Sequence, residues 1–207
     1  FDTNGVLQDP GFYEYGDGFH LGAGNSLGTP LTEVTTDFDN EPRDETTPDI
    51  GADEYLAPNY DGIVEVPGEI TTIQGAIDIA ASGDSIKVAA GTYTENIDFS
   101  GKNIVVIGEN RETTIIDGNQ SESVVKFISG EDSTAVLMGF TITNGSAEFG
   151  GGIRCQLTST NPRLENLRIT GNAATYGGGV NSSIWANPSL VNVTISNNTA
   201  LWGGGGI

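Results

Sequence analysis

The 207-residue chain has few of the residues on which many sites depend: it holds one Cys, one His and one Met. A single cysteine, Cys155, excludes an internal disulfide framework and a zinc site built from several cysteines. No stretch approaches ~20 consecutive apolar residues, so no membrane-spanning helix is predicted. Basic residues are scarce, because 8 Lys and Arg face 28 Asp and Glu, for a net charge of −20. Nucleic acid is therefore not expected as a partner, since like charges repel.

Glycine and acidic residues are abundant instead. The 30 glycines follow no three-residue period, which excludes collagen, and the 36% of hydrophobic residues can form a core. Residues 1–61 hold 14 acidic residues and one base, whereas residues 62–207 hold 14 and seven. This asymmetry indicates two structural units or, more simply, a solvated acidic face beside a neutral one. Pro and Gly in residues 56–62 predict a linker.

The second half of the chain contains an internal repeat. Three nine-residue segments align without gaps: residues 137–145, 164–172 and 190–198. Each segment is followed by an aromatic residue and a run of glycines. Their first residues are 27 and 26 positions apart: Leu137, Leu164 and Leu190. The aromatic residues show the same two intervals: Phe149, Tyr176 and Trp202. Two independent markers with one period predict a stack of similar coils.

Each period has the pattern of a short strand followed by a corner. Leu167 and Ile169 are apolar and Arg168 between them is charged, which fits a strand with one buried face. Gly and Asn follow, and both tolerate the backbone of tight corners. One coil cannot close its own core, but stacked copies can. The repeat therefore predicts an all-β fold, a parallel β-helix solenoid with about 26–27 residues per coil in the last coils.

Less regular coils and a short helix precede the repeats. Apolar patterns predict four upstream strands, at residues 85–88, 103–108, 113–118 and 123–128. Before them, one helical stripe is formed by Ile73, Ala76, Ile77 and Ala80. Thr71 or Thr72 would cap its start and Gly83 its end, and the helix would cover the first coil. We therefore predict a first strand and capping helix at 63–84 and coils at 85–207 that continue beyond residue 207.

Stacking in register would place like residues above one another. The expected columns are Asn166–Asn192, Asn172–Asn198 and Phe149–Tyr176–Trp202. Asparagine side chains can bond along such a column and to corner amides, and stacked aromatic rings add dispersion. We interpret these columns as structural.

Several of these stretches resemble a known family. Residues 66–80 and 83–95, with Asn-Ile-Val-Val-Ile-Gly at 103–108 and Thr-Ile-Ile-Asp-Gly at 114–118, resemble the opening segment of right-handed parallel β-helix proteins of the pectin-lyase-like superfamily. The aromatic-Gly-Gly-Gly-Ile units are similar to repeats of polymorphic outer-membrane proteins. The resemblance covers roughly residues 63–207 and implies a right-handed β-helix, a fold that hosts lyases, hydrolases, adhesins and binding proteins.

The first unit resembles the closing segment of such β-helices. The stretches that carry this resemblance are residues 17–26, 36–43 and 49–55, although Ser26-Leu-Gly-Thr-Pro30 replaces the usual Ser-Pro-Ala-Ile-Asp. In bacterial surface proteins this segment often precedes an anchor, the choice-of-anchor arrangement. The resemblance implies that residues 1–55 close a preceding β-helix. The parent would be a large bacterial secreted or outer-surface protein with tandem β-helix domains, its signal peptide outside this sequence.

Catalytic groupings are not predicted. The lyases of this fold need clustered carboxylates for Ca²⁺ and a basic residue, but residues 137–207 contain only Glu148 and Glu165 as acids. The hydrolases resemble one another in paired Asp motifs and a Gly-His-Gly, and the single histidine here is His20 in the other unit. We therefore assign no catalytic residue.

The remaining candidates concern metal and ligand binding. Oxygens at alternate positions make Asp37, Asp39 and Asp44 candidates for Ca²⁺, the alternative being an acidic turn tied by Arg43. No other cofactor is predicted. Three arginines form either a patch for a sugar acid or outward solubilising charges: Arg154, Arg163 and Arg168. Cys155 follows a buried Gly-Gly-Ile and is predicted as a small core side chain.

Two functions remain open from the sequence. The first is a non-enzymatic extracellular β-helix repeat region, serving as a surface stalk, adhesin or carbohydrate-binding module for a polysaccharide or cell-surface glycan. Regular repeats, acidity and the surface-protein resemblance favour it. The alternative is part of a polysaccharide lyase or glycoside hydrolase whose active coils lie beyond residue 207.

Overall fold

The computed structural model of the chain describes residues 12–15, 18–21, 62–68 and 70–207. The chain divides into two compact units, Phe1–Asp61 and Gly62–Ile207. In the first, β1 (Phe12–Tyr15) and β2 (Gly18–Leu21) pair antiparallel. The finer divisions predicted at residues 1–55, 56–62 and 63–84 stay predictions.

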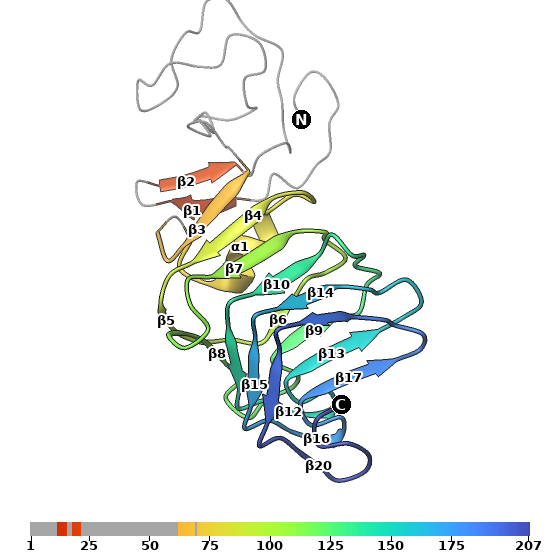
Figure 1. Cartoon of the computed structure of the whole chain (residues 1–207). Helices are drawn as coiled ribbons and strands as arrows, with labels where there is room; N and C mark the ends of the chain where they lie inside the picture. Colours follow the sequence, from red (N-terminus) through yellow and green to blue (C-terminus); the bar gives the residue numbers. More distant parts are fainter. Residues whose placement is uncertain (1–11, 16–17, 22–61, 69) are drawn as a thin grey trace, which may run out of the picture. The chain divides into compact units, whose positions relative to one another are not determined.

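The second unit is a parallel β-solenoid of about 5 turns, as predicted (Figure 1). Its six-stranded sheet contains β3 (Ile63–Val66), β4 (Ser85–Val88), β7 (Val105–Gly108), β10 (Val136–Met138), β14 (Arg163–Glu165) and β18 (Ser189–Val191). Its five-stranded sheet contains β5 (Gly91–Thr94), β8 (Thr114–Asp117), β11 (Thr141–Thr143), β15 (Arg168–Thr170) and β19 (Thr194–Ser196).

Two smaller sheets complete the coils. The four-stranded sheet contains β6 (Ile97–Asp98), β9 (Val125–Phe127), β13 (Ile153–Gln156) and β17 (Val180–Ser183). The three-stranded sheet contains β12 (Ser146–Phe149), β16 (Ala173–Tyr176) and β20 (Thr199–Ala200). Strands in these two sheets also pair in parallel, so each coil supplies its strands to the same stacked layers.

The register of the last coils follows the sequence repeat. Leu137 pairs with Leu164 and Leu164 with Leu190, which confirms the predicted period of 27 and 26 residues. In the earlier coils the same column consists of Val64, Ile86 and Val106, followed by Leu137. Successive residues of this part of the column are 22, 20 and 31 positions apart in the sequence. Insertions of different length between the strands therefore vary the coil length while the strand register is preserved.

Alternation along the strands produces the core. In β9, Val125 and Phe127 are buried and Lys126 between them points the other way. In β13, Ile153 and Cys155 are buried and Arg154 between them points outward in the same manner. Phe99 and Phe127 are fully buried with ring centroids 4.2 Å apart. Burial of such side chains contributes about 1.5–3 kcal/mol each, and stacking repeats this contribution in every coil.

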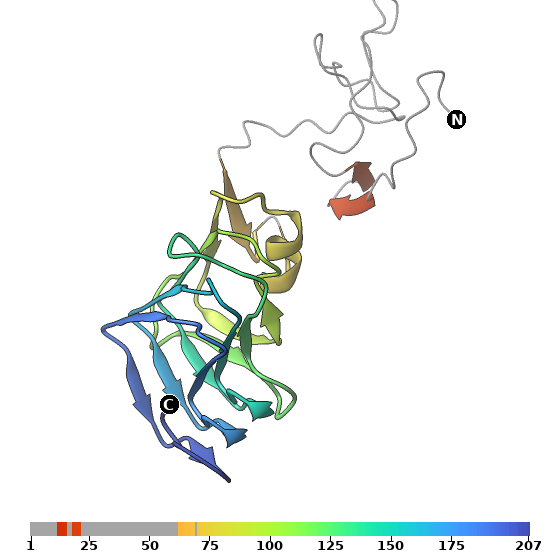
Figure 2. The same ribbon diagram turned by 90° about the vertical axis from the view of Figure 1, so that its right-hand side faces the viewer.

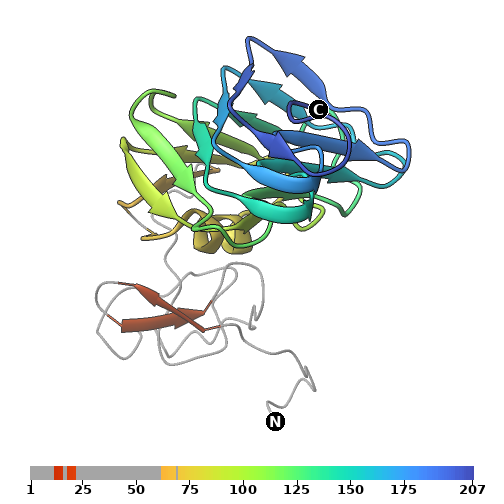
Figure 3. The ribbon, with the colours of Figure 1, turned by 90° about the horizontal axis from the view of Figure 1, so that it is seen from below.

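The predicted capping helix is α1 (Ile73–Ile79), which packs against β3, β4 and β6 at the end of the solenoid where its first strands lie (Figures 2 and 3). Thr72 is the N-cap and accepts a hydrogen bond from Gly75 N at 3.1 Å. The prediction of Gly83 as C-cap is wrong. The helix ends at Ile79 and its C-cap is Ala80, which has an extended backbone. Gly83, at φ +102°, belongs to the turn closed by Asp84 N donating to Ala81 O at 3.1 Å.

No helix of the described part of the chain is long and apolar enough to cross a membrane.

The glycine runs allow adjacent coils to approach closely. A Cβ on Gly151 would overlap the carbonyl oxygens of Ala173 and Gly178 in the next coil. One coil later, a Cβ on Gly178 would overlap those of Thr199 and Gly205. The repeat of glycines in the sequence therefore reflects backbone packed against backbone at one corner.

Candidate functional site

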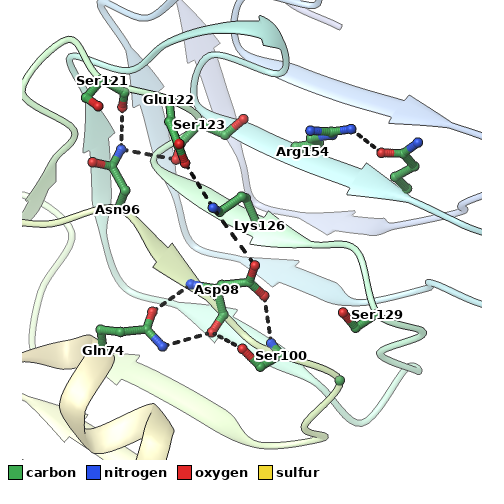
Figure 4. Close-up of polar contacts among 12 residues, drawn as sticks. Gln74, Asn96, Asp98, Ser100, Ser121, Glu122, Ser123, Lys126, Ser129 and Arg154 are labelled. Carbon is green, nitrogen blue, oxygen red and sulfur yellow. Dashed lines mark hydrogen bonds and ion pairs between the residues drawn. The ribbon is translucent and has the colours of Figure 1, made fainter.

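The outer face of the four-stranded sheet carries a row of polar side chains, one from each strand. In register across β6, β9, β13 and β17 lie Asp98, Lys126, Arg154 and Asn181. All four are half-buried, and the residue before each of them points into the core and is buried. We call Asp98, Lys126, Arg154 and Asn181 the polar row; Figure 4 shows its first three members.

Helix α1 positions the first member of the polar row. Gln74 accepts a hydrogen bond from Asp98 N at 2.8 Å and donates to Asp98 O at 3.3 Å. The carboxylate of Asp98 in turn accepts from Ser100 N at 2.8 Å. These contacts, visible in Figure 4, hold the edge strand β6 and leave the second carboxylate oxygen toward Lys126.

Lys126 lies between two carboxylates. Its Nζ is 3.0 Å from Glu122 Oε2 and 4.0 Å from Asp98 Oδ2. Behind Glu122, the loop is held by Asn96, whose amide donates to the carbonyl oxygens of Ser121 and Ser123 (Figure 4). The ammonium charge of Lys126 is thus compensated within the protein.

Arg154 differs from the other arginines that the structure describes, because none of the described carboxylates lies within 4.0 Å of its guanidinium. Its Nη2 donates to Gln156 Oε1, and its Cζ lies 5.6 Å from the ring centroid of Phe149. Its Nε and the Oδ1 of Asn181 are buried without hydrogen-bond partners. By contrast, ion pairs hold the three other described arginines: Arg111–Glu112, Arg163–Glu165 and Arg168–Glu112. Arg154 therefore has an uncompensated charge beside an aromatic ring.

The three arginines that the sequence offered as a patch for a sugar acid do not lie together. Arg154 lies on the four-stranded sheet, Arg163 begins β14 in the six-stranded sheet and Arg168 begins β15 in the five-stranded sheet. Only Arg154 is left as a ligand-binding candidate.

The aromatic column borders the polar row. The rings of Phe149 and Tyr176 are stacked, with centroids 5.3 Å apart and planes at 14°. Tyr176 is 42% exposed. Trp202 pairs through its backbone, donating from N to Thr175 O at 2.7 Å, but the residue is 63% exposed and its ring makes no ring contact within the described residues. The stacked column thus contains two rings rather than three.

The asparagine columns hold the coils together. Asn192 Nδ2 donates to Asn166 Oδ1 at 3.1 Å on the surface. Asn172 is buried; it accepts from Gly145 N at 2.9 Å and donates to Ile142 O at 3.1 Å and to Asn198 Oδ1 at 3.0 Å. Both pairs link neighbouring coils, and Asn172 in addition satisfies backbone groups of the adjacent coil.

The other sequence candidates are placed as follows. Asp37, Asp39 and Asp44 lie outside the described residues, and within the described ones no group of three or more His, Cys, Asp or Glu could hold a metal ion.

Cys155 is a buried core residue, as predicted. Burial and, to a smaller extent, the charge of Glu131 raise the pKa of its thiol to about 12. The thiol therefore stays protonated and is a poor nucleophile.

Sequence reasoning missed the polar row, although a signal was present. Asp98, Lys126 and Arg154 follow one another at intervals of 28 residues, close to the period of the repeats. Each also sits directly after a buried aliphatic residue: Ile97, Val125 and Ile153.

Comparisons with protein-family models, with curated proteins and with solved structures found no match.

Proposed function

We propose that the chain is part of a non-enzymatic extracellular β-solenoid that binds carbohydrate on the outer face of its four-stranded sheet. The observation that carries the proposal is Arg154, a guanidinium without a carboxylate partner that lies 5.6 Å from the Phe149 ring. It stands within a row of half-buried polar side chains rather than alone on the surface.

The chemistry of the polar row suits a sugar. Carbohydrates present hydroxyl groups that donate and accept hydrogen bonds, together with apolar C–H faces. The amide of Asn181, the ammonium of Lys126 and the carboxylate of Asp98 supply both kinds of hydrogen-bonding group. The Phe149 ring, which stacks on Tyr176, supplies an apolar surface beside Arg154.

Arg154 favours a glycan that carries a carboxylate or sulfate. A planar guanidinium binds such groups through two parallel hydrogen bonds. The net charge of −20 repels anionic ligands from most of the chain, so a local cation without a carboxylate partner decides where such a ligand binds.

The family and location are part of the same proposal. The opening segment at residues 66–95 and the aromatic-glycine repeats support membership of the right-handed parallel β-helices of the pectin-lyase-like superfamily. The resemblance of residues 1–55 to a closing segment supports a tandem arrangement in a bacterial secreted or surface protein. A stalk or adhesin that holds a glycan would use a rigid solenoid of this kind.

The test is a glycan-array screen of the 207-residue chain, followed by titration of the glycans that bind. Arg154→Gln should reduce affinity for acidic glycans at least tenfold, because it removes the cation and keeps an amide. Arg168→Gln is the matched control, since Arg168 lies on another sheet and pairs with Glu112 at 2.6 Å. Absence of glycan binding, or equal losses in both variants, would overturn the proposal.

The same samples should be assayed for unsaturated or shortened products from uronate polymers, with and without Ca²⁺. Binding without turnover supports the proposal. Product formation would replace it with a lyase or hydrolase activity.

A further inference from the structure

The turn that follows β17 has an unusual combination of residues and backbone. Ala186 N donates to Ser183 O at 3.2 Å, and the two residues between them, Ile184 and Trp185, have φ of +55° and +64°. Type I′ turns share this pair of positive φ values and normally contain Asn and Gly. A β-branched residue such as Ile is strained there, because its Cβ crowds the backbone.

Among the residues that the structure describes, none packs closely enough on the side chains of Ile184 and Trp185 to compensate for this strain. Trp185 is 86% exposed and Ile184 is 50% exposed, so neither gains much from packing. The turn is nevertheless held closed, because Ser182 Oγ donates to Ala186 O at 2.7 Å. Strained backbone of this kind occurs at ligand contacts, where a rigid turn presents a side chain without an ordering cost at binding.

We infer that the Ser183–Ala186 turn is a second contact for the glycan, in which the indole of Trp185 stacks on the apolar face of a sugar ring. The inference rests on the proposed function, because it assigns a further binding residue to the same ligand. Strand β17 links the two contacts: Asn181 belongs to the polar row, and Ser183, on the same face of the strand, opens the turn.

A sugar fits this turn better than a lipid surface. Membrane-binding segments combine apolar side chains with Lys and Arg that attract anionic lipids. Residues 169–207 contain no charged side chain, and the chain as a whole is strongly acidic. Stacking on one sugar ring requires a single exposed aromatic face beside hydrogen-bonding groups, and the adjacent residues Asn181, Ser183 and Asn187 are polar.

Tryptophan fluorescence gives a direct test, because the chain has two tryptophans, Trp185 and Trp202. Trp202→Phe leaves Trp185 as the only tryptophan. On addition of an acidic glycan selected on the array, its emission should shift to shorter wavelength and acrylamide quenching should weaken. Trp185→Phe is the matched control, in which Trp202 should show neither change.

Affinity provides the second readout. Trp185→Ala should weaken glycan binding about tenfold with an unchanged circular dichroism spectrum, since an exposed side chain is removed. If the chain binds the glycan with Arg154-dependent affinity while Trp185→Ala binds equally well and the emission is unchanged, this inference fails and the proposed function stands. An emission shift with phosphatidylcholine vesicles and none with glycan would also overturn it, in favour of lipid.

Discussion

Lys126 and Arg154 lie side by side on adjacent strands β9 and β13, but their electrostatic surroundings differ. Lys126 Nζ is 3.0 Å from Glu122 Oε2, whereas Arg154 faces the Phe149 ring and the amide of Gln156. The protein thus compensates one of two neighbouring cations and leaves the other available. Under the proposed function, single substitutions should therefore alter the ligand preference of this surface.

Glu122→Gln should strengthen binding of acidic glycans about two- to fivefold at low salt and less at high salt. The substitution removes a negative charge and releases Lys126 from its ion pair, and Glu122 is exposed, so the free energy of unfolding should change by less than about 1 kcal/mol. Calorimetric titration at two salt concentrations measures the effect. Glu165→Gln, which breaks the Arg163 pair on the six-stranded sheet, should leave affinity unchanged. Weaker binding of acidic glycans by Glu122→Gln would contradict the proposal that the polar row binds them.

Asn172→Ala should lower the free energy of unfolding by about 3 kcal/mol, because Gly145 N and Ile142 O lose their partner. Asn166→Gly is the matched control. It removes a surface bond to Asn192 while tolerating the φ of +50°, and should cost less than about 1 kcal/mol. Urea unfolding followed by circular dichroism compares the two. A similar loss of unfolding free energy in the two variants would mean that the buried column and the surface column contribute equally to stability.

The last three coils were predictable from the sequence because their strands and corners recur at one period. Leu137, Leu164 and Leu190 face the same direction in successive coils, so the repeat specifies the register. In the earlier coils the interval changes, to 31 residues between Val106 and Leu137. A gapless comparison therefore loses the alignment of this column there. The polar row keeps its interval of 28 residues through the same coils, but its members differ in chemical type, so a search for like residues does not detect it.

Other features depend on contacts between distant residues. Glu95 accepts hydrogen bonds from Ile73 N and Gln74 N, at 3.0 and 2.9 Å, and so completes the N-terminal capping of α1 from another coil. No local pattern marks Glu95 for this role. The absence of a carboxylate beside Arg154 likewise depends on which side chains the neighbouring coils supply, and sequence alone gave three equivalent arginines.

Gly151→Ala should destabilise the solenoid by about 2–3 kcal/mol, because the added Cβ would meet the carbonyl oxygens of Ala173 and Gly178. Gly130→Ala serves as the comparison. Its Cβ would have open space, and only its φ of +87° would oppose the substitution, at a cost of about 1 kcal/mol. Thermal unfolding of the two variants should therefore give a clearly lower midpoint for Gly151→Ala. The reverse order would show that the corner relaxes easily.

The stability of the chain should fall as the pH rises above 9. Burial raises the pKa of the Cys155 thiol from its ordinary value of 9.0 to about 12, so the unfolded chain releases this proton first. The contribution amounts to about 1.4 kcal/mol per pH unit between these values and is absent below pH 9. Cys155→Ala lacks the thiol and should show a shallower decline of the free energy of unfolding, whatever its stability at neutral pH. If the free energy of unfolding falls equally steeply with pH in the two proteins, the prediction is contradicted.

Ile184→Gly should raise the free energy of unfolding by about 1 kcal/mol, although it removes apolar contacts. Glycine adopts the φ of +55° without the steric cost that isoleucine incurs, and Ile184 is 50% exposed, so little packing is lost. Val191→Gly is the control: Val191 is 40% exposed within strand β18 and is not among the residues with positive φ, so glycine should destabilise there. If Ile184→Gly is more stable yet binds glycan more weakly, the strain at this turn maintains the orientation of Trp185 for its ligand. A loss of stability equal to that of Val191→Gly would show that the turn carries no strain.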